Sequence, residues 1–291
     1  MGSSIKDIVD SGSVYIIAEI GQNHQGDIEH AKKLIRKAAE AGVNAVKSQK
    51  RHTRTLLTPD EYDRPYDSPN AFADTYGKHR DALELSVEQH LELKQVAENL
   101  GLDYFVSPWD PVSASQMNEV GMPLMKIASA GITDKETIDA ACKGGAPLIF
   151  STGMSTEGEI EQAANWVREA GIEIKCILHC TSTYPAEFNQ LNLNYIPVLK
   201  QNYPDFIIGF SGHHRGISID IAAVTLGAKI IERHFTLDRT QKGSDHAASL
   251  EFPGLSKLVR DIRALELAMG DGIKRVYEQE LPMIEKLRRV K

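Results

Sequence analysis

The chain has 291 residues, of which 42% are hydrophobic and 25% charged, an ordinary composition for a globular protein. Its formal net charge of −7 excludes a general nucleic-acid surface, which needs a basic excess. No signal-peptide pattern is visible, nor any apolar run of the roughly 18 residues that span a bilayer, so we expect a cytoplasmic protein without a membrane partner. The three cysteines, at positions 142, 176 and 180, are odd in number and predict free thiols rather than a disulfide framework.

Short apolar runs alternate with amphipathic stretches along the whole chain. This alternation predicts parallel strands that are each followed by a helix, and eight such units in one domain predict a (β/α)8 barrel, an α/β fold. The expected strands cover residues 14–19, 45–49, 103–106, 124–128, 147–151, 175–179, 206–209 and 229–233. The expected helices cover residues 27–41, 86–99, 111–120, 134–142, 157–170, 192–201, 218–226 and 254–269.

Two segments depart from this alternation. Residues 51–85 fit neither a helical nor a strand period and contain three prolines, so we expect a long excursion from the barrel. Whether its aromatic part is a lid or an oligomer contact stays open. The first dozen residues are expected to form an N-terminal hairpin that plugs the barrel.

Two histidines follow consecutive predicted strands. His213 comes after the seventh strand and His234 ends the eighth, at the carboxyl ends of the strands, where such barrels build their active sites. Adjacent strands make these side chains neighbours in space, which favours a shared divalent metal. Imidazole and oxygen ligands would suit Mn, Fe, Co or Zn.

Lysines lie inside two of the apolar strands. Lys47 and Lys126 would be costly there unless they are paired or face a ligand. We favour an anion pocket for phosphate or carboxylate, with structural pairing to Glu19 and Glu232 as the alternative. Hydroxyl groups at the strand ends, Ser107, Ser151 and Ser211, are interpreted either as helix caps or as anion-binding groups.

These residues stand in stretches that resemble the sialic acid synthase family, which makes N-acetylneuraminate and related nonulosonates. They include IAEIGQNHQGD (17–27), YGKHRDALELSVEQ (76–89), KIASAGIT (126–133), IGFSGHHRGI (208–217) and IIERHFTLDRTQKGSDHAASLE (230–251). The resemblance implies a transferase that condenses phosphoenolpyruvate with a sugar aldehyde and releases phosphate by C–O cleavage. The sugar would be N-acetylmannosamine, its 6-phosphate or a related hexosamine. The resemblance also implies a divalent metal, with manganese before magnesium, cobalt or iron, and a homodimer.

The family's functional residues can be carried over to matching positions. The resemblance implies catalytic roles for Glu19, His213 and His234, with the two histidines as metal ligands. It implies substrate-binding roles for Lys47, Gln49, Asn70, Lys126, Ser129, Ser151, Tyr184, Ser211 and Asp245.

The chain also departs from the family pattern. Pro108, Gly131 and Ser182 replace residues found in other members, all on the substrate side, so the acceptor sugar is less well determined than the reaction. Members usually continue into an antifreeze-like domain, which would begin where this chain ends, so we expect a single barrel over residues 1–291 without it. Two alternatives stay open: a related synthase for another nonulosonate or 3-deoxy sugar acid, and a non-catalytic sugar-binding barrel.

Overall fold

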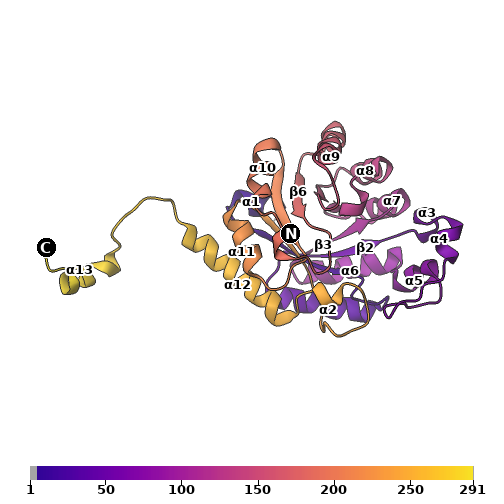
Figure 1. Ribbon diagram of the computed structural model, residues 1–291, viewed down its shortest axis with the longest axis horizontal. Coiled ribbons are helices and arrows are strands. Elements are labelled where there is room, and N and C mark those ends of the chain that lie inside the picture. The colour runs from indigo at the N-terminus through magenta and orange to yellow at the C-terminus, as the bar shows by residue number, and fades with distance from the viewer. Residues whose placement is uncertain (1–4, 291) are drawn as a thin grey trace.

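The computed structural model describes residues 5–290, and its centre is a closed barrel of eight parallel strands surrounded by helices (Figure 1). Each strand pairs with the next one in the chain, and β1 also pairs with β8. The predicted barrel is therefore confirmed. The strands are β1 (Tyr15–Gly21), β2 (Ala45–Lys50), β3 (Asp103–Pro108), β4 (Met125–Ile127), β5 (Leu148–Ser151), β6 (Lys175–Cys180), β7 (Ile207–Gly212) and β8 (Ile230–His234).

The expected helix follows each strand, with ends that the local sequence explains. Ser86 caps α6 by accepting from the backbone of Gln89, whose side chain accepts from the backbone of Ser86 in return. At the end of α2, Gly42 adopts a left-handed φ of 87°, which glycine tolerates best. The main helices are α2 (Ile28–Ala41), α6 (Val87–Asn99), α7 (Pro111–Glu119), α8 (Lys135–Cys142), α9 (Glu157–Glu169), α10 (Tyr195–Asn202), α11 (Ser218–Thr225) and α12 (Phe252–Met269).

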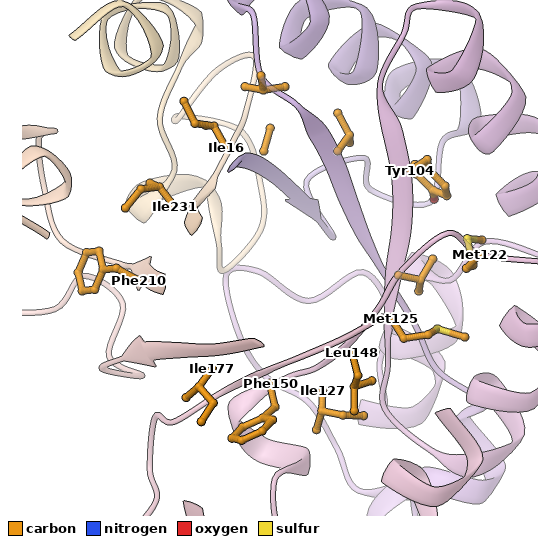
Figure 2. Close-up of a cluster of buried hydrophobic side chains, with 14 of the residues drawn as sticks. Ile16, Tyr104, Met122, Met125, Ile127, Leu148, Phe150, Ile177, Phe210 and Ile231 are labelled. Carbon is orange, nitrogen blue, oxygen red and sulfur yellow. The ribbon is translucent and has the colours of Figure 1, made fainter. Parts of the chain in front are cut away.

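Side chains alternate between the two faces of each strand. Outward-facing residues form one large apolar cluster between the strands and the helices, and Figure 2 shows Ile16, Tyr104 and Phe210 among its members. Inward-facing residues at the amino ends of the strands form a second apolar cluster, which includes Ile17 and Phe105. Further along the same inward rows the residues become polar. The fold thus closes one end of the barrel with apolar side chains and leaves the polar groups to the other.

The amino-terminal end of the barrel is covered by a helix. The expected hairpin is wrong for the described part of this segment, because residues 5–10 form α1 (Ile5–Asp10). Ile5 and Ile8, three residues apart, lie on one face of this helix and pack against the inner apolar cluster. Residues 1–4 of the predicted hairpin lie outside the described residues.

The excursion after β2 is more regular than its sequence suggested. It contains three short helices, α3 (Thr53–Leu56), α4 (Pro59–Asp63) and α5 (Tyr76–Leu83). Thr58 forms a capping box with Glu61 at the start of α4, and Thr75 caps α5. These helices are too short for an apolar period to show in the sequence, so their polar caps are the local signal for them.

The carboxyl-terminal segment after α12 extends away from the barrel (Figure 1). It contains a short helix, α13 (Leu281–Leu287), and most of its large apolar side chains are exposed. No helix within residues 5–290 is both long enough and apolar enough to cross a membrane.

Candidate functional site

Four charged side chains meet inside the carboxyl-terminal half of the barrel. Lys47 on β2 pairs with Glu19 on β1, and its Nζ also donates to Ser107 Oγ at 2.9 Å. Lys126 Nζ on β4 lies 2.7 Å from Glu232 Oε1 on β8, and all four charged side chains are at most 5% exposed. The structural pairing considered from the sequence is therefore present. The same four side chains line a cavity of about 170 Å³, so pairing does not remove them from the pocket.

The two lysines favour the charged form of Glu232. Burial alone would raise the pKa of Glu232, but the ammonium groups of Lys126 and Lys47 outweigh it and hold that pKa well below its usual range. Ser211 Oγ donates to the same carboxylate at 3.2 Å. The barrel interior thus holds fixed charges of both signs, with the cations available to an anion that enters the cavity.

The strand-end serines do not cap helices. The residues at the caps of α7, α9 and α11 are Asp110, Thr156 and Ile217, so the capping interpretation of Ser107, Ser151 and Ser211 is wrong. All three instead line the cavity, as does Ser129, whose Oγ accepts from the backbone N–H of Gly153. The Ser151 hydroxyl is buried without a hydrogen-bond partner among the described residues. Buried hydroxyl groups are normally hydrogen-bonded, so an unpaired one that lines a cavity can bond to an oxygen of a bound ligand.

His213 and His234 lie side by side at the mouth of this cavity. Their ring centroids are 5.3 Å apart, and the ring of Tyr184 lies 4.2 Å from that of His213. The Nδ1 of His213 donates to the backbone carbonyl of Thr181 at 2.9 Å, so in the neutral ring the lone pair is on Nε2. Nδ1 of His234 is buried without a hydrogen-bond partner among residues 5–290. The two strands thus bring two imidazoles together, as the sequence predicted.

The histidine pair supplies two of the donors that a divalent metal needs. Burial lowers the pKa of His234, so its ring is neutral near pH 7 and its nitrogens can act as ligands. The nearest carboxylate oxygen is Asp245 Oδ2, 3.8 Å from His234 Nδ1. Among residues 5–290 there is no group of three His, Cys, Asp or Glu side chains arranged to hold an ion. The residues fit a metal that completes its coordination with substrate and water oxygens.

Two of the predicted sugar-side residues, Gln49 and Asp245, lie close to Gly21. A Cβ added there would lie 2.9 Å from Glu19 Oε1, 3.1 Å from Gln49 Nε2 and 3.3 Å from Asp245 Oδ2. Three polar groups therefore converge above β1. Gln49 lines the main cavity, whereas Asp245 and Asn70 line a neighbouring one, and Asp245 separates the two.

Several residues of the site were not assigned to it from the sequence. Trp109 and Cys180 line the main cavity, and Cys180 Sγ lies 3.8 Å from His213 Nδ1. Ser182, which the sequence placed on the substrate side, lines the same cavity. Cys180 is a buried free thiol as predicted. Glu232 lies two residues before His234, so both side chains lie on the inward face of β8. This spacing could have assigned Glu232 to the cavity from the sequence.

Comparison with known proteins agrees with this geometry. The model of the NeuB family matches residues 34–274, which is most of the barrel. The chain belongs to the NeuB family. The family resemblance and the enzyme class expected from the sequence, a transferase of the phosphoenolpyruvate-condensing type, are thereby confirmed.

Individual NeuB relatives differ in the product that their names state. The chain is 40% identical over 273 residues to the N-acetylneuraminate-9-phosphate synthase of Homo sapiens, covering 94% of this chain and 76% of the relative. It is 39% identical to the N,N'-diacetyllegionaminic acid synthase of Campylobacter jejuni, covering 94% and 83%. The solved N-acetylneuraminic acid synthetase of Leptospira borgpetersenii superposes with a TM-score of 0.79 at 33% identity, covering 96% and 93%.

Proposed function

We propose that this NeuB-family enzyme condenses phosphoenolpyruvate with the aldehyde of N-acetylmannosamine, of its 6-phosphate or of a related hexosamine. The products would be a sialic-acid-type 2-keto sugar acid and phosphate. The observation that supports this most directly is the arrangement of Lys47, Lys126 and the unpaired Ser151 hydroxyl in one cavity beside His213 and His234. The lysines and the serine would bind the anionic reactant, and the adjacent histidines would lie beside the aldehyde oxygen of the sugar.

The chain's own groups would position phosphoenolpyruvate. Lys47 and Lys126 would bind its phosphate and carboxylate, with Ser129, Ser151 and Ser211 donating hydrogen bonds. Glu19 and Glu232 pair with the lysines and orient them inside the barrel. Holding both reactants in the right orientation in one cavity makes a bimolecular step effectively unimolecular, and this would supply a large part of the rate enhancement.

Bond changes in the proposed reaction balance as follows. The double-bond electrons of phosphoenolpyruvate form the bond from carbon 3 to the aldehyde carbon, the π bond of the aldehyde opens, its oxygen takes up a proton, and positive charge develops at carbon 2. Glu19, which already accepts a hydrogen bond from Gln49 at 2.8 Å, would stabilise that charge and guide water to carbon 2, where the water loses one proton as it bonds. The C–O bond to phosphate then breaks, the phosphate leaves with the second proton of that water, and the 2-keto acid remains.

A divalent metal is part of the proposal, with His213 and His234 as its protein ligands. Manganese is the first candidate, with magnesium, cobalt and iron as the others. When bound, the metal would act as a Lewis acid on the aldehyde oxygen. Tyr184 covers the histidine rings and would limit how the sugar approaches them.

The test is incubation with phosphoenolpyruvate, manganese and a panel of N-acetylhexosamines with and without a 6-phosphate, followed by phosphate assay and mass spectrometry. A product heavier than the sugar by the pyruvate unit, with stoichiometric phosphate, supports the proposal. Preference for a hexose with two acetylated amino groups, added to the panel, would favour the alternative suggested by the N,N'-diacetyllegionaminic acid synthase relative. Absence of phosphate release with every aldose would refute the proposal and favour a non-catalytic sugar-binding barrel.

We also propose a homodimer, as the family resemblance implies. Exposed apolar side chains on the extended carboxyl-terminal segment, such as Ile273 at 67% and Tyr277 at 58% exposure, support it. Light scattering at several concentrations would test this, and a monomeric mass throughout would contradict it.

A further inference from the structure

A second cavity opens beside the main one, and Asp245 lies between them. It has a volume of about 120 Å³ and is formed by the loop after β1, by the excursion with α5, and by the loop around Gly243. Asn70 Oδ1 accepts from the backbone N–H of Gly243 at 3.2 Å, which ties the excursion to this loop. We call this cavity the distal pocket. A sugar whose aldehyde lies at the histidines and whose chain passes Asp245 would place its far end here.

The distal pocket is rich in positive charge. Arg80 on α5 lines it, and the ammonium of Lys242 lies at its edge, 4.8 Å from the centroid of the Phe72 ring that also lines it. Within residues 5–290, neither cation has a carboxylate oxygen within 4.0 Å. The one carboxylate in the pocket wall, Asp245, lies on the side of His234 and accepts from Ser244. The cations are therefore free to bind an anion.

The titration behaviour of one pocket residue is consistent with this field. Burial comes first in lowering the pKa of His79 to about 4, and the charges of Arg80, Lys242 and Arg51 lower it further. The second contribution is the one expected beside converging cations.

Hydrogen-bond donors remain unused in the same pocket. Arg80 donates from Nε and one terminal nitrogen to Tyr76 Oη and from the other to Gln22 Oε1, which occupies three of its five N–H groups. These contacts fix the guanidinium and leave one N–H on each terminal nitrogen. The Nε2 of Gln22 is buried without a partner among the described residues. A fixed guanidinium fork with free donors suits a phosphate oxygen pair.

We propose that the distal pocket binds a phosphate group on the terminal carbon of the acceptor sugar, through Arg80 and Lys242, so that the enzyme prefers a phosphorylated hexosamine. This inference rests on the proposed condensation and deepens it by selecting the acceptor class. It distinguishes between the two kinds of product that the relatives' names state, one phosphorylated and one not.

The test compares kcat/KM for an N-acetylhexosamine and its 6-phosphate in the wild type and in Arg80→Gln, Lys242→Gln and the double variant. The wild type should prefer the phosphorylated sugar. Each single variant should lower the ratio of the two kcat/KM values by about ten- to a hundred-fold, the effect of a lost hydrogen bond to a charged group. Arg80→Lys, which keeps the charge but loses the fork, should lower it less. The preference should weaken as salt rises.

Lys78→Gln is the matched control. It removes the same charge from the same helix, but Lys78 is exposed and pairs with Asp74, so the ratio should not change. A wild type that turns over both sugars equally, or variants that lower both kcat/KM values by the same factor, would overturn the distal site while leaving the condensation standing.

If no phosphate is released with any aldose, the proposed condensation is refuted. Calorimetry can still test whether the distal pocket binds a sugar phosphate. Hexosamine 6-phosphate should bind the wild type more tightly than the neutral sugar, and Arg80→Gln should abolish the difference. Equal binding of the two sugars, or a difference that persists in the variant, would overturn the proposal.

Discussion

Lys126 and Glu232 form an ion pair across the interior of the barrel, with Nζ 2.7 Å from Oε1 and both side chains at most 5% exposed. They belong to β4 and β8, so the pair spans the barrel rather than one strand junction. A buried pair of this kind adds little net stability, but removing one partner leaves a buried charge uncompensated. Single and double variants of this pair can therefore distinguish the contribution of Lys126 to folding from its contribution to ligand binding.

Lys126→Met should lower the free energy of unfolding by about 3–5 kcal/mol and abolish condensation. Adding Glu232→Leu should restore most of the stability, because the unpaired carboxylate is gone, without restoring activity. Urea unfolding and phosphate release measure the two effects separately. Recovery of activity in the double variant would show that Lys126 does not hold the substrate anion.

Ser151→Ala should raise the KM for phosphoenolpyruvate by about tenfold with little change in stability. Its hydroxyl is buried without a partner, so removing it breaks no hydrogen bond within the described protein. Ser113→Ala is the control, because its buried Oγ donates to Asp110 at 2.7 Å and Ser113 does not line the cavity. That variant should lose about 1 kcal/mol of stability and keep its KM. The reverse pattern would assign Ser151 a structural role.

Chelation should stop phosphate release, and manganese should restore it. His213→Gln and His234→Gln should each lose activity that added metal cannot restore, because one of two protein ligands is missing. Metal binding measured by calorimetry should weaken in parallel. Full turnover of the wild type in chelator would contradict the metal assignment.

Asp27 should stabilise the fold in a pH-dependent way. Its Oδ1 accepts from the backbone N–H groups of Glu29 and His30 at the start of α2, and these bonds lower its pKa below the ordinary value of 3.8. A lowered folded pKa means that the stabilisation is complete above the unfolded value and is lost as pH falls through the folded one. Asp27→Ala should cost about 1 kcal/mol at pH 7 and less near pH 2. Asp27→Ser, an uncharged cap, should show no such pH dependence. Thermal unfolding at both values checks this.

The order of strands and the convergence of the strand ends could be predicted because both follow from local patterns. Apolar runs and their helices define the barrel, and its topology then makes His213 and His234 neighbours. The sequence left two interpretations of Lys126, an anion-binding group or a partner of Glu232. It could not decide between them, because the register of the strands across the barrel is not encoded in a local pattern. The distal pocket could not be predicted. Arg80 lies in an excursion without a period, and its approach to Gly243 depends on tertiary packing.

The apolar layer beneath the charged cluster, closed below by Ile5, has a kinetic consequence. Among the described residues this layer fills the amino-terminal end, so reactants and products would pass through the carboxyl-terminal end of the barrel. In the proposed reaction the anion bound at Lys47 and Lys126 lies deeper than a sugar that reaches Asn70. Phosphoenolpyruvate would then have to enter first, because a sugar bound alone would obstruct it. Steady-state kinetics should therefore show an ordered mechanism with substrate inhibition by the aldose.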